Sequence, residues 1–187
     1  DLVRSRGLGD VYKRQEAAFV SGELNAEAYE ECDLQKYQFL ATLDLRTSEI
    51  CRSLDGKRFF LKDRQVGKNY PPMHPWCRST TIAVISEDDI KKLKRRALNP
   101  ETGRTELVPA SMTYGEWYKK YVKDNPKAKG QEKAIQNKAS DQAQYQKYKK
   151  SGIDGVPASF TGFQKLKYQE PEKWELLKKD YRERKKQ

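Results

Sequence analysis

The sequence predicts an α+β fold: a small, mostly antiparallel sheet of three or four strands, flanked by helices, with an extended basic helical C-terminal region. Apolar residues are dense only between residues 36 and 85, where short β-rich runs alternate with turns. The second half of the chain is rich in Lys and has helix-type spacing. With 36% hydrophobic and 35% charged residues among 187, we expect one small core plus helical extensions.

The central apolar segment divides into short elements. Thr47 is expected to be the N-cap of a short helix that runs to Leu54, and Asp55-Gly56 is expected to turn the chain. Apolar side chains alternate with more polar ones in the first strand, and β-branched residues dominate the last. Three strands are therefore predicted, at residues 36–44, 58–61 and 80–85.

A proline-rich loop separates the last two of these strands. Pro71, Pro72 and Pro75 lie within five residues of one another. Proline fixes φ and has no backbone N–H, so the segment from Tyr70 to Ser79 is predicted to be a stiff loop and neither sheet nor helix.

The first residues do not resemble natural protein sequence. Asp10 to Gln15 is the translation of GAT GTG TAT AAG AGA CAG, the end of a widely used transposase sequencing adapter, and residues 5–9 match the bases upstream. We interpret residues 1–15 as a translated adapter artefact, with a basic N-terminal arm as the alternative, and exclude them from fold reasoning. Residues 16–32 are predicted to be a helix.

After the central segment the pattern is mainly helical. Ser86 begins a capped, acidic first turn that is expected to continue as helix through the basic run to Arg96. A turn at residues 99–103 leads into a strand at 105–108. Further helices are predicted at residues 113–121, 131–150, 159–167 and 172–184.

Charge is unevenly divided. Residues 1–90 carry 13 Lys+Arg and 15 Asp+Glu, whereas residues 91–187 carry 25 and 12, net charges of −2 and +13. A basic helical region is typical of a protein that lies near phosphate, although a solvated helical face gives the same composition. Candidate nucleic-acid contacts are Lys91, Lys92, Lys94, Arg95 and Arg96. No run of about 18 apolar residues indicates a membrane span.

Cys51, His74 and Cys77 form a candidate metal site. Cys and His three residues apart across a stiff turn can face one cation, Cys51 can be a third ligand, and Asp44 or Cys32 a fourth, which gives a tetrahedral zinc site. The alternative is that the thiols are small buried hydrophobes and that His74 bonds a loop carbonyl. The three Cys lack paired spacing, which indicates a reducing cytoplasm and not a disulfide scaffold.

No catalytic residues are predicted. A Cys–His hydrolase would use Cys51 or Cys77 as nucleophile, but His74 is too close in sequence to Cys77, and no oxyanion glycine loop is present. We instead expect four charged residues to form ion pairs that pin the loop against the sheet: Asp44, Arg46, Asp55 and Arg78.

These motifs carry a family resemblance. Leu43-Asp44-x-Arg46-Thr47-Ser48-x-x-Cys51, Leu54-Asp55-Gly56 and Pro71-Pro72-x-His74-Pro75-Trp76-Cys77-Arg78 resemble the phage head morphogenesis domain of minor head proteins. That family is typified by the phage Mu F protein and the SPP1 minor head protein. The resemblance covers roughly residues 16–86, and a weaker one to phage minor capsid proteins covers parts of 159–174.

The resemblance implies a non-enzymatic virion protein. It would bind the portal and capsid proteins, act during procapsid assembly in the host bacterial cytoplasm, and stay inside the head, with non-specific contacts to packaged double-stranded DNA. Residues 16–90 would form the Mu F-like domain and 91–187 the basic region. Some relatives have Cys where this chain has Ser48 and Ser79. The alternatives are a delivery module of a nuclease-type toxin and a zinc-stabilised interaction module.

Overall fold

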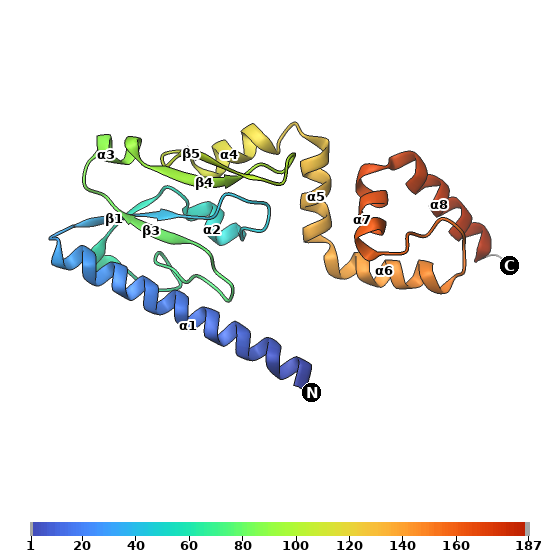
Figure 1. The fold of residues 1–187 in the computed structure, drawn as a ribbon, viewed down its shortest axis with the longest axis horizontal. Helices are drawn as coiled ribbons and strands as arrows, with labels where there is room; N and C mark the ends of the chain where they lie inside the picture. The colour runs from blue at the N-terminus through green and yellow to red at the C-terminus, as the bar shows by residue number, and fades with distance from the viewer. Residues whose placement is uncertain (1, 186–187) are drawn as a thin grey trace. The chain divides into compact units, whose positions relative to one another are not determined.

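The computed structural model describes residues 2–185, and the side chains of 9–185 apart from those of Glu87 and Asp89. These residues form two compact units, one of residues 2–99 and 104–118, the other of residues 100–103 and 119–185 (Figure 1). The first unit thus extends beyond residue 90, where the predicted head domain ends, and each unit has its own core.

A three-stranded antiparallel sheet forms the centre of the first unit. Its order is β2-β1-β3, with β1 between two antiparallel neighbours. The register sets Tyr37 opposite Phe59 on one side and opposite Ala83 on the other. The strands are β1 (Lys36–Leu40), β2 (Arg58–Phe60) and β3 (Thr80–Ala83). This confirms the predicted α+β class with a small antiparallel sheet.

Helix α1 (Leu2–Glu31) lies along this sheet (Figure 1). Ala26 is fully buried in a cluster with Tyr37 and Tyr70. The Tyr70 hydroxyl donates to the Gly22 carbonyl over 2.6 Å. A Cβ at Gly22 would lie 3.2 Å from the Pro71 carbonyl oxygen, so the absence of a side chain there permits the close approach of helix and loop.

The predicted strand at residues 36–44 is too long, because β1 ends at Leu40. The next residue leaves the ladder, since the Ala41 N–H donates to the Asp55 carboxylate over 2.7 Å. The predicted strand at 80–85 likewise ends early, at Ala83.

Helix α2 (Glu49–Leu54) occurs where it was predicted, but its cap is a different residue. Ser48, not Thr47, is the N-cap, and its side chain accepts a hydrogen bond from the Cys51 N–H. The Thr47 hydroxyl is already engaged with the Thr42 carbonyl and the Asp44 carboxylate.

The predicted helix through residue 96 is also wrong. Helix α3 (Glu87–Lys92) ends early, and β4 (Lys94–Leu98) pairs with β5 (Thr105–Pro109) in an antiparallel hairpin. Ala97 is buried and forms a bridge to Leu43, which joins the hairpin to the segment after β1. Tertiary pairing therefore overrides the local helical preference of the basic run.

Helix α4 (Tyr114–Tyr121) begins where a helix was predicted, directly after Thr113. Glu116 accepts from the Thr113 N–H over 2.7 Å, while the Thr113 hydroxyl accepts from the Glu116 N–H, a reciprocal capping box. Trp117 is fully buried and donates its indole N–H to the Leu98 carbonyl, so this helix packs on the hairpin.

The second unit is helical. The helices predicted at 159–167 and 172–184 are present, with Ser159 as an N-cap and Pro171 in the first turn of the last helix, but the expected helix over 131–150 is divided at Asn137. Its core is mainly aromatic: Tyr145, Tyr148, Phe163, Trp174 and Leu177. Tyr145 and Tyr148 thus supply the buried hydrophobic side chains of residues 138–150, a segment that has almost no aliphatic residues. The helices are α5 (Pro126–Gln136), α6 (Lys138–Lys150), α7 (Phe160–Gln169) and α8 (Pro171–Arg184).

Net charge differs between the two units. The second unit, counted with residues 186–187, has 19 basic and 10 acidic residues, a net charge of +9, and the first, counted with residue 1, has 19 and 17, a net charge of +2. Among the described residues, none of the helices is long and apolar enough to cross a bilayer.

Candidate functional site

The proline-rich loop is anchored at both ends in the first unit. Tyr70 is fully buried and meets the Tyr37 ring edge-on at 5.1 Å. Met73 and Cys77 pack against the buried cluster of Phe39 and Cys51. The loop, which contains a cis Pro71-Pro72 bond, is therefore part of the packed structure.

One ion pair pins the C-terminal end of the loop. The Arg78 guanidinium donates two hydrogen bonds to the Asp44 carboxylate, one of them over 2.9 Å. The Thr42 hydroxyl donates to the Arg78 carbonyl, which fixes the backbone as well. Arg46 was expected to join such a pair, but its side chain is exposed, and it donates its backbone N–H to Asp44.

These contacts also set the acidity of Asp44. Burial alone would raise the pKa of its carboxyl group, but the hydrogen bonds and positive charge of Arg78 outweigh burial. The Arg46 N–H and the Thr47 hydroxyl act in the same direction, so the pKa lies below its ordinary value.

A second ion pair lies deeper. The Asp55 side chain is 1% exposed and that of Arg95 is 8% exposed, and their charged atoms are 3.0 Å apart. Asp55 also accepts from the N–H groups of Ala41 and Tyr114, at 2.7 and 2.6 Å. One carboxylate thus joins the end of α2, the segment after β1, the hairpin and the start of α4. Gly56 follows it with φ +78°, a conformation that favours glycine.

Cys51, His74 and Cys77 come together as predicted. Their ligand atoms all lie within 4.8 Å of one another. The Cys51 Sγ lies 3.4 Å from His74 Nε2 and 3.8 Å from the Cys77 Sγ. The predicted fourth ligands do not join them, because Asp44 is engaged with Arg78 and Cys32 lies exposed at the end of α1.

Hydrogen bonds define the state of this cluster. The His74 Nδ1 lies 2.7 Å from the Pro75 carbonyl, which can only accept, so Nδ1 carries a proton, and in the neutral imidazole Nε2 is then an acceptor. Within the thiol pair, the hydrogen bond from Cys51 lowers the pKa of Cys77, and the same bond, together with burial, raises the pKa of Cys51.

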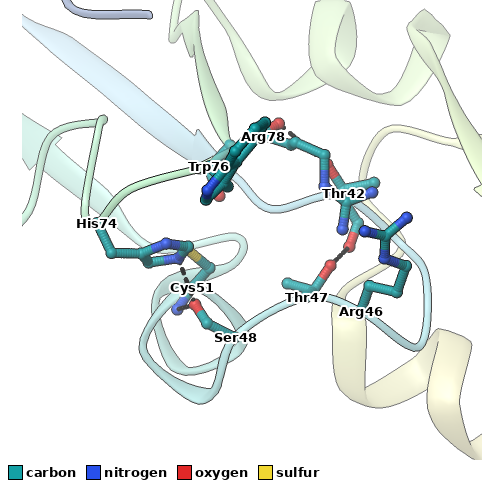
Figure 2. Close-up of a pocket in the computed structure, with 9 residues that line it drawn as sticks. Thr42, Arg46, Thr47, Ser48, Cys51, His74, Trp76 and Arg78 are labelled. Carbon is teal, nitrogen blue, oxygen red and sulfur yellow. Dashed lines mark hydrogen bonds between the residues drawn. The ribbon is translucent and has the colours of Figure 1, made fainter. Parts of the chain in front are cut away.

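Sequence reasoning missed the role of Ser48. Its hydroxyl lies 2.7 Å from His74 Nε2, which Figure 2 shows beside Cys51. The available signal was the spacing, since Ser48-x-x-Cys51 has the separation of a Cys-x-x-Cys pair. A cavity of about 30 Å³ adjoins this group, and Figure 2 labels most of its lining: Thr42, Arg46, Thr47, Ser48, Cys51, His74, Trp76 and Arg78.

Four of the five predicted nucleic-acid residues are exposed, and Arg95 is not. Lys91 and Lys92 end α3, whereas Lys94, Arg95 and Arg96 belong to β4. Because side chains alternate along a strand, Arg95 turns inward to Asp55 while its neighbours are exposed. Arg95 is therefore a structural residue, which corrects its predicted role.

The fold and the site define a small α+β domain built around a pinned proline-rich loop. Residues 4–82 match the family model described as Phage Mu protein F like protein, which confirms the resemblance to phage head morphogenesis and minor capsid proteins. The matched residues are therefore similar to that family, whose members are phage head proteins. No curated protein and no solved structure matches the chain.

The match begins at residue 4, so it includes most of the segment interpreted as translated adapter. That interpretation stays a prediction.

Proposed function

We propose that the chain is a non-enzymatic, portal-associated minor capsid protein that acts in procapsid assembly. In this proposal the first unit docks on the portal protein through the proline-rich loop, and the basic second unit contacts packaged DNA. The family match supports a role in the phage head. The docking role rests on the structure of the loop. The Arg78–Asp44 ion pair holds it in place, and it exposes an aromatic side chain to solvent.

Trp76 is that side chain. It is 50% exposed and has a φ of +64°, a backbone conformation unusual for a residue other than glycine. Tryptophan is over-represented among residues that dominate binding energy, and a preorganised loop loses little entropy on binding. The neighbouring Pro75 and the pinned Arg78 add rigidity on either side.

Portal binding by the full-length chain tests the docking role. Replacement of Trp76 by Ala is expected to weaken binding to the portal protein of the same phage by at least about tenfold, the usual effect of losing an interface anchor. Leu107→Ala is the matched control, because Leu107 is 65% exposed on β5, away from the loop. Equal affinities for the two variants would refute docking through the loop.

The second unit supports the DNA contact through its net charge of +9. Its lysines are spread over several helices, and Lys147, Lys149 and Lys150 are exposed in the last turns of α6. Spread positive charge suits sequence-independent binding to phosphates, which is strongly salt dependent.

A salt titration of DNA affinity tests this contact. Replacement of Lys147, Lys149 and Lys150 by Gln should reduce the slope of log affinity against log salt, by up to about 2.7 if all three contact phosphate. The same change at Lys57, Lys62 and Lys68, which are exposed in the first unit, is the control. Equal slopes would contradict the contact, and cleavage of the DNA would contradict a non-enzymatic role.

A further inference from the structure

We propose that Cys51, His74 and Cys77 bind a soft divalent cation such as zinc, and that this ion staples the proline-rich loop to α2. The residues come from two segments separated by 23 positions, and their ligand atoms lie within 4.8 Å of one another. The inference goes beyond the proposed function, since portal binding and DNA binding do not require it.

The distances within the cluster fit a tetrahedral ion. Zinc lies about 2.3 Å from thiolate sulfur and about 2.0–2.1 Å from imidazole nitrogen, so tetrahedral angles place two sulfurs about 3.8 Å apart and sulfur and nitrogen about 3.5 Å apart. The structure has 3.8 Å between the sulfurs of Cys51 and Cys77 and 3.4 Å between the Cys51 sulfur and His74 Nε2. Two of the three edges between the protein ligands thus match a tetrahedral shell, and the third, from Cys77 Sγ to His74 Nε2, is within 4.8 Å.

The imidazole has the form that a metal needs. His74 donates its Nδ1 proton to the Pro75 carbonyl, which leaves the lone pair on Nε2 for the Ser48 hydroxyl at 2.7 Å, with the Cys51 sulfur at 3.4 Å, and an ion would take the place of that hydroxyl contact. Metal-bound histidines commonly hold their other ring nitrogen in this way, because the hydrogen bond fixes the tautomer and the ring orientation. Two thiolates would neutralise the charge of the ion, and binding would release the thiol protons.

The fourth position belongs to a water molecule. The adjoining cavity of about 30 Å³ is larger than the 10–15 Å³ that one water requires. Ser48 lies at its edge, with its hydroxyl 2.7 Å from His74 Nε2, so it can hydrogen-bond such a water. A cysteine at this position would stand three residues before Cys51 and close the shell with a third sulfur.

Cobalt(II) substitution in the full-length reduced protein tests the site. The wild type is expected to show thiolate-to-cobalt charge transfer and the intense visible bands of a tetrahedral centre. Adding zinc should displace the cobalt and abolish these bands. Cys51→Ser and Cys77→Ser should each weaken these bands. Cys32→Ser is the matched control, because this thiol is exposed and outside the cluster. A wild-type protein without such bands, or bands that require Cys32, would overturn the proposal.

A variant that adds a ligand keeps the site testable even if the Cys→Ser variants do not fold. Ser48→Cys should raise zinc affinity by at least about tenfold, since four protein ligands close a structural zinc site. An unchanged affinity would place Ser48 away from the ion and contradict the geometry. Intact mass under non-reducing conditions gives a further decision: a Cys51–Cys77 disulfide in freshly prepared protein, with no metal bound, would overturn the proposal in favour of a redox pair.

Discussion

Replacement of Asp55 by Asn is expected to lower the stability of the first unit strongly. The side chain keeps its size but loses its charge and one acceptor oxygen. The new amide group must face a donor, since the two oxygens of Asp55 accept from Arg95, Ala41 and Tyr114. The guanidinium of Arg95, 8% exposed, is then left without its counter-charge. Breaking one partner of a buried pair costs about 3–5 kcal/mol.

Such a loss approaches the whole stability of a marginal domain, which is about 5–15 kcal/mol. Urea unfolding measures this loss of stability. Hydrogen exchange at the amides of Ala41 and Tyr114 locates the loss, because both amides donate to Asp55. Removal of both partners in Asp55→Asn/Arg95→Met should restore part of the stability, since no buried charge is then left unpaired.

Asp88→Asn is the control for this experiment. Asp88 pairs with Lys91 on the surface, where its side chain is 80% exposed, so the change should shift stability by no more than about 0.5 kcal/mol. If Asp55→Asn behaved like Asp88→Asn, Asp55 would not be the residue that joins the parts of the first unit.

Two further predictions concern acid stability and the second unit. Because the folded-state pKa of Asp44 lies below its ordinary value of 3.8, its contribution is present above that pH and is lost as the pH falls through the lower folded value. Acid titration of stability should therefore be flatter for Asp44→Asn, which should cost about 1–2 kcal/mol at neutral pH, and an unchanged acid profile would refute the linkage. Phe163 is fully buried among aromatic rings, so Phe163→Ala should destabilise the second unit by about 3–5 kcal/mol. Residue-resolved hydrogen exchange should show this loss in α6–α8 and spare the amides of β1, and uniform destabilisation of both units would contradict their independence.

The sequence predicts well those features that local chemistry decides. Ser159 and Thr113 cap helices because their side chains bond nearby amides, and three closely spaced prolines can only form a loop. The meeting of Cys51 with His74 and Cys77 was also predictable, since a stiff turn limits where the last two can point.

Features decided by distant partners could not be predicted in this way. The basic run at Lys94–Leu98 is a strand because it pairs with β5 and because Arg95 meets Asp55, 40 positions away. Ser48 and Thr47 are both good caps by residue type, and the contacts of Thr47 with Thr42 and Asp44 leave Ser48 as the cap. The tyrosine core of the second unit is similarly invisible to a search for aliphatic stripes.

The same physical limit applies to domain boundaries. A change in charge near residue 90 indicates a boundary, but the hairpin and α4 add to the first core and carry it to Tyr118. Burial of Trp117 and Ala97 decides this extension, and neither residue stands out in a charged segment.

Hydrogen exchange of residues 70–79, measured with and without the portal protein of the same phage, tests the central claim most directly. The amide of Tyr70 donates to the Gln65 carbonyl and that of Cys77 to the His74 carbonyl, so the free chain should already show protection there, and portal binding should increase it. Exchange at the rate of an unfolded peptide in the free chain, or protection by the portal only in the second unit, would contradict a pinned loop that docks on the portal.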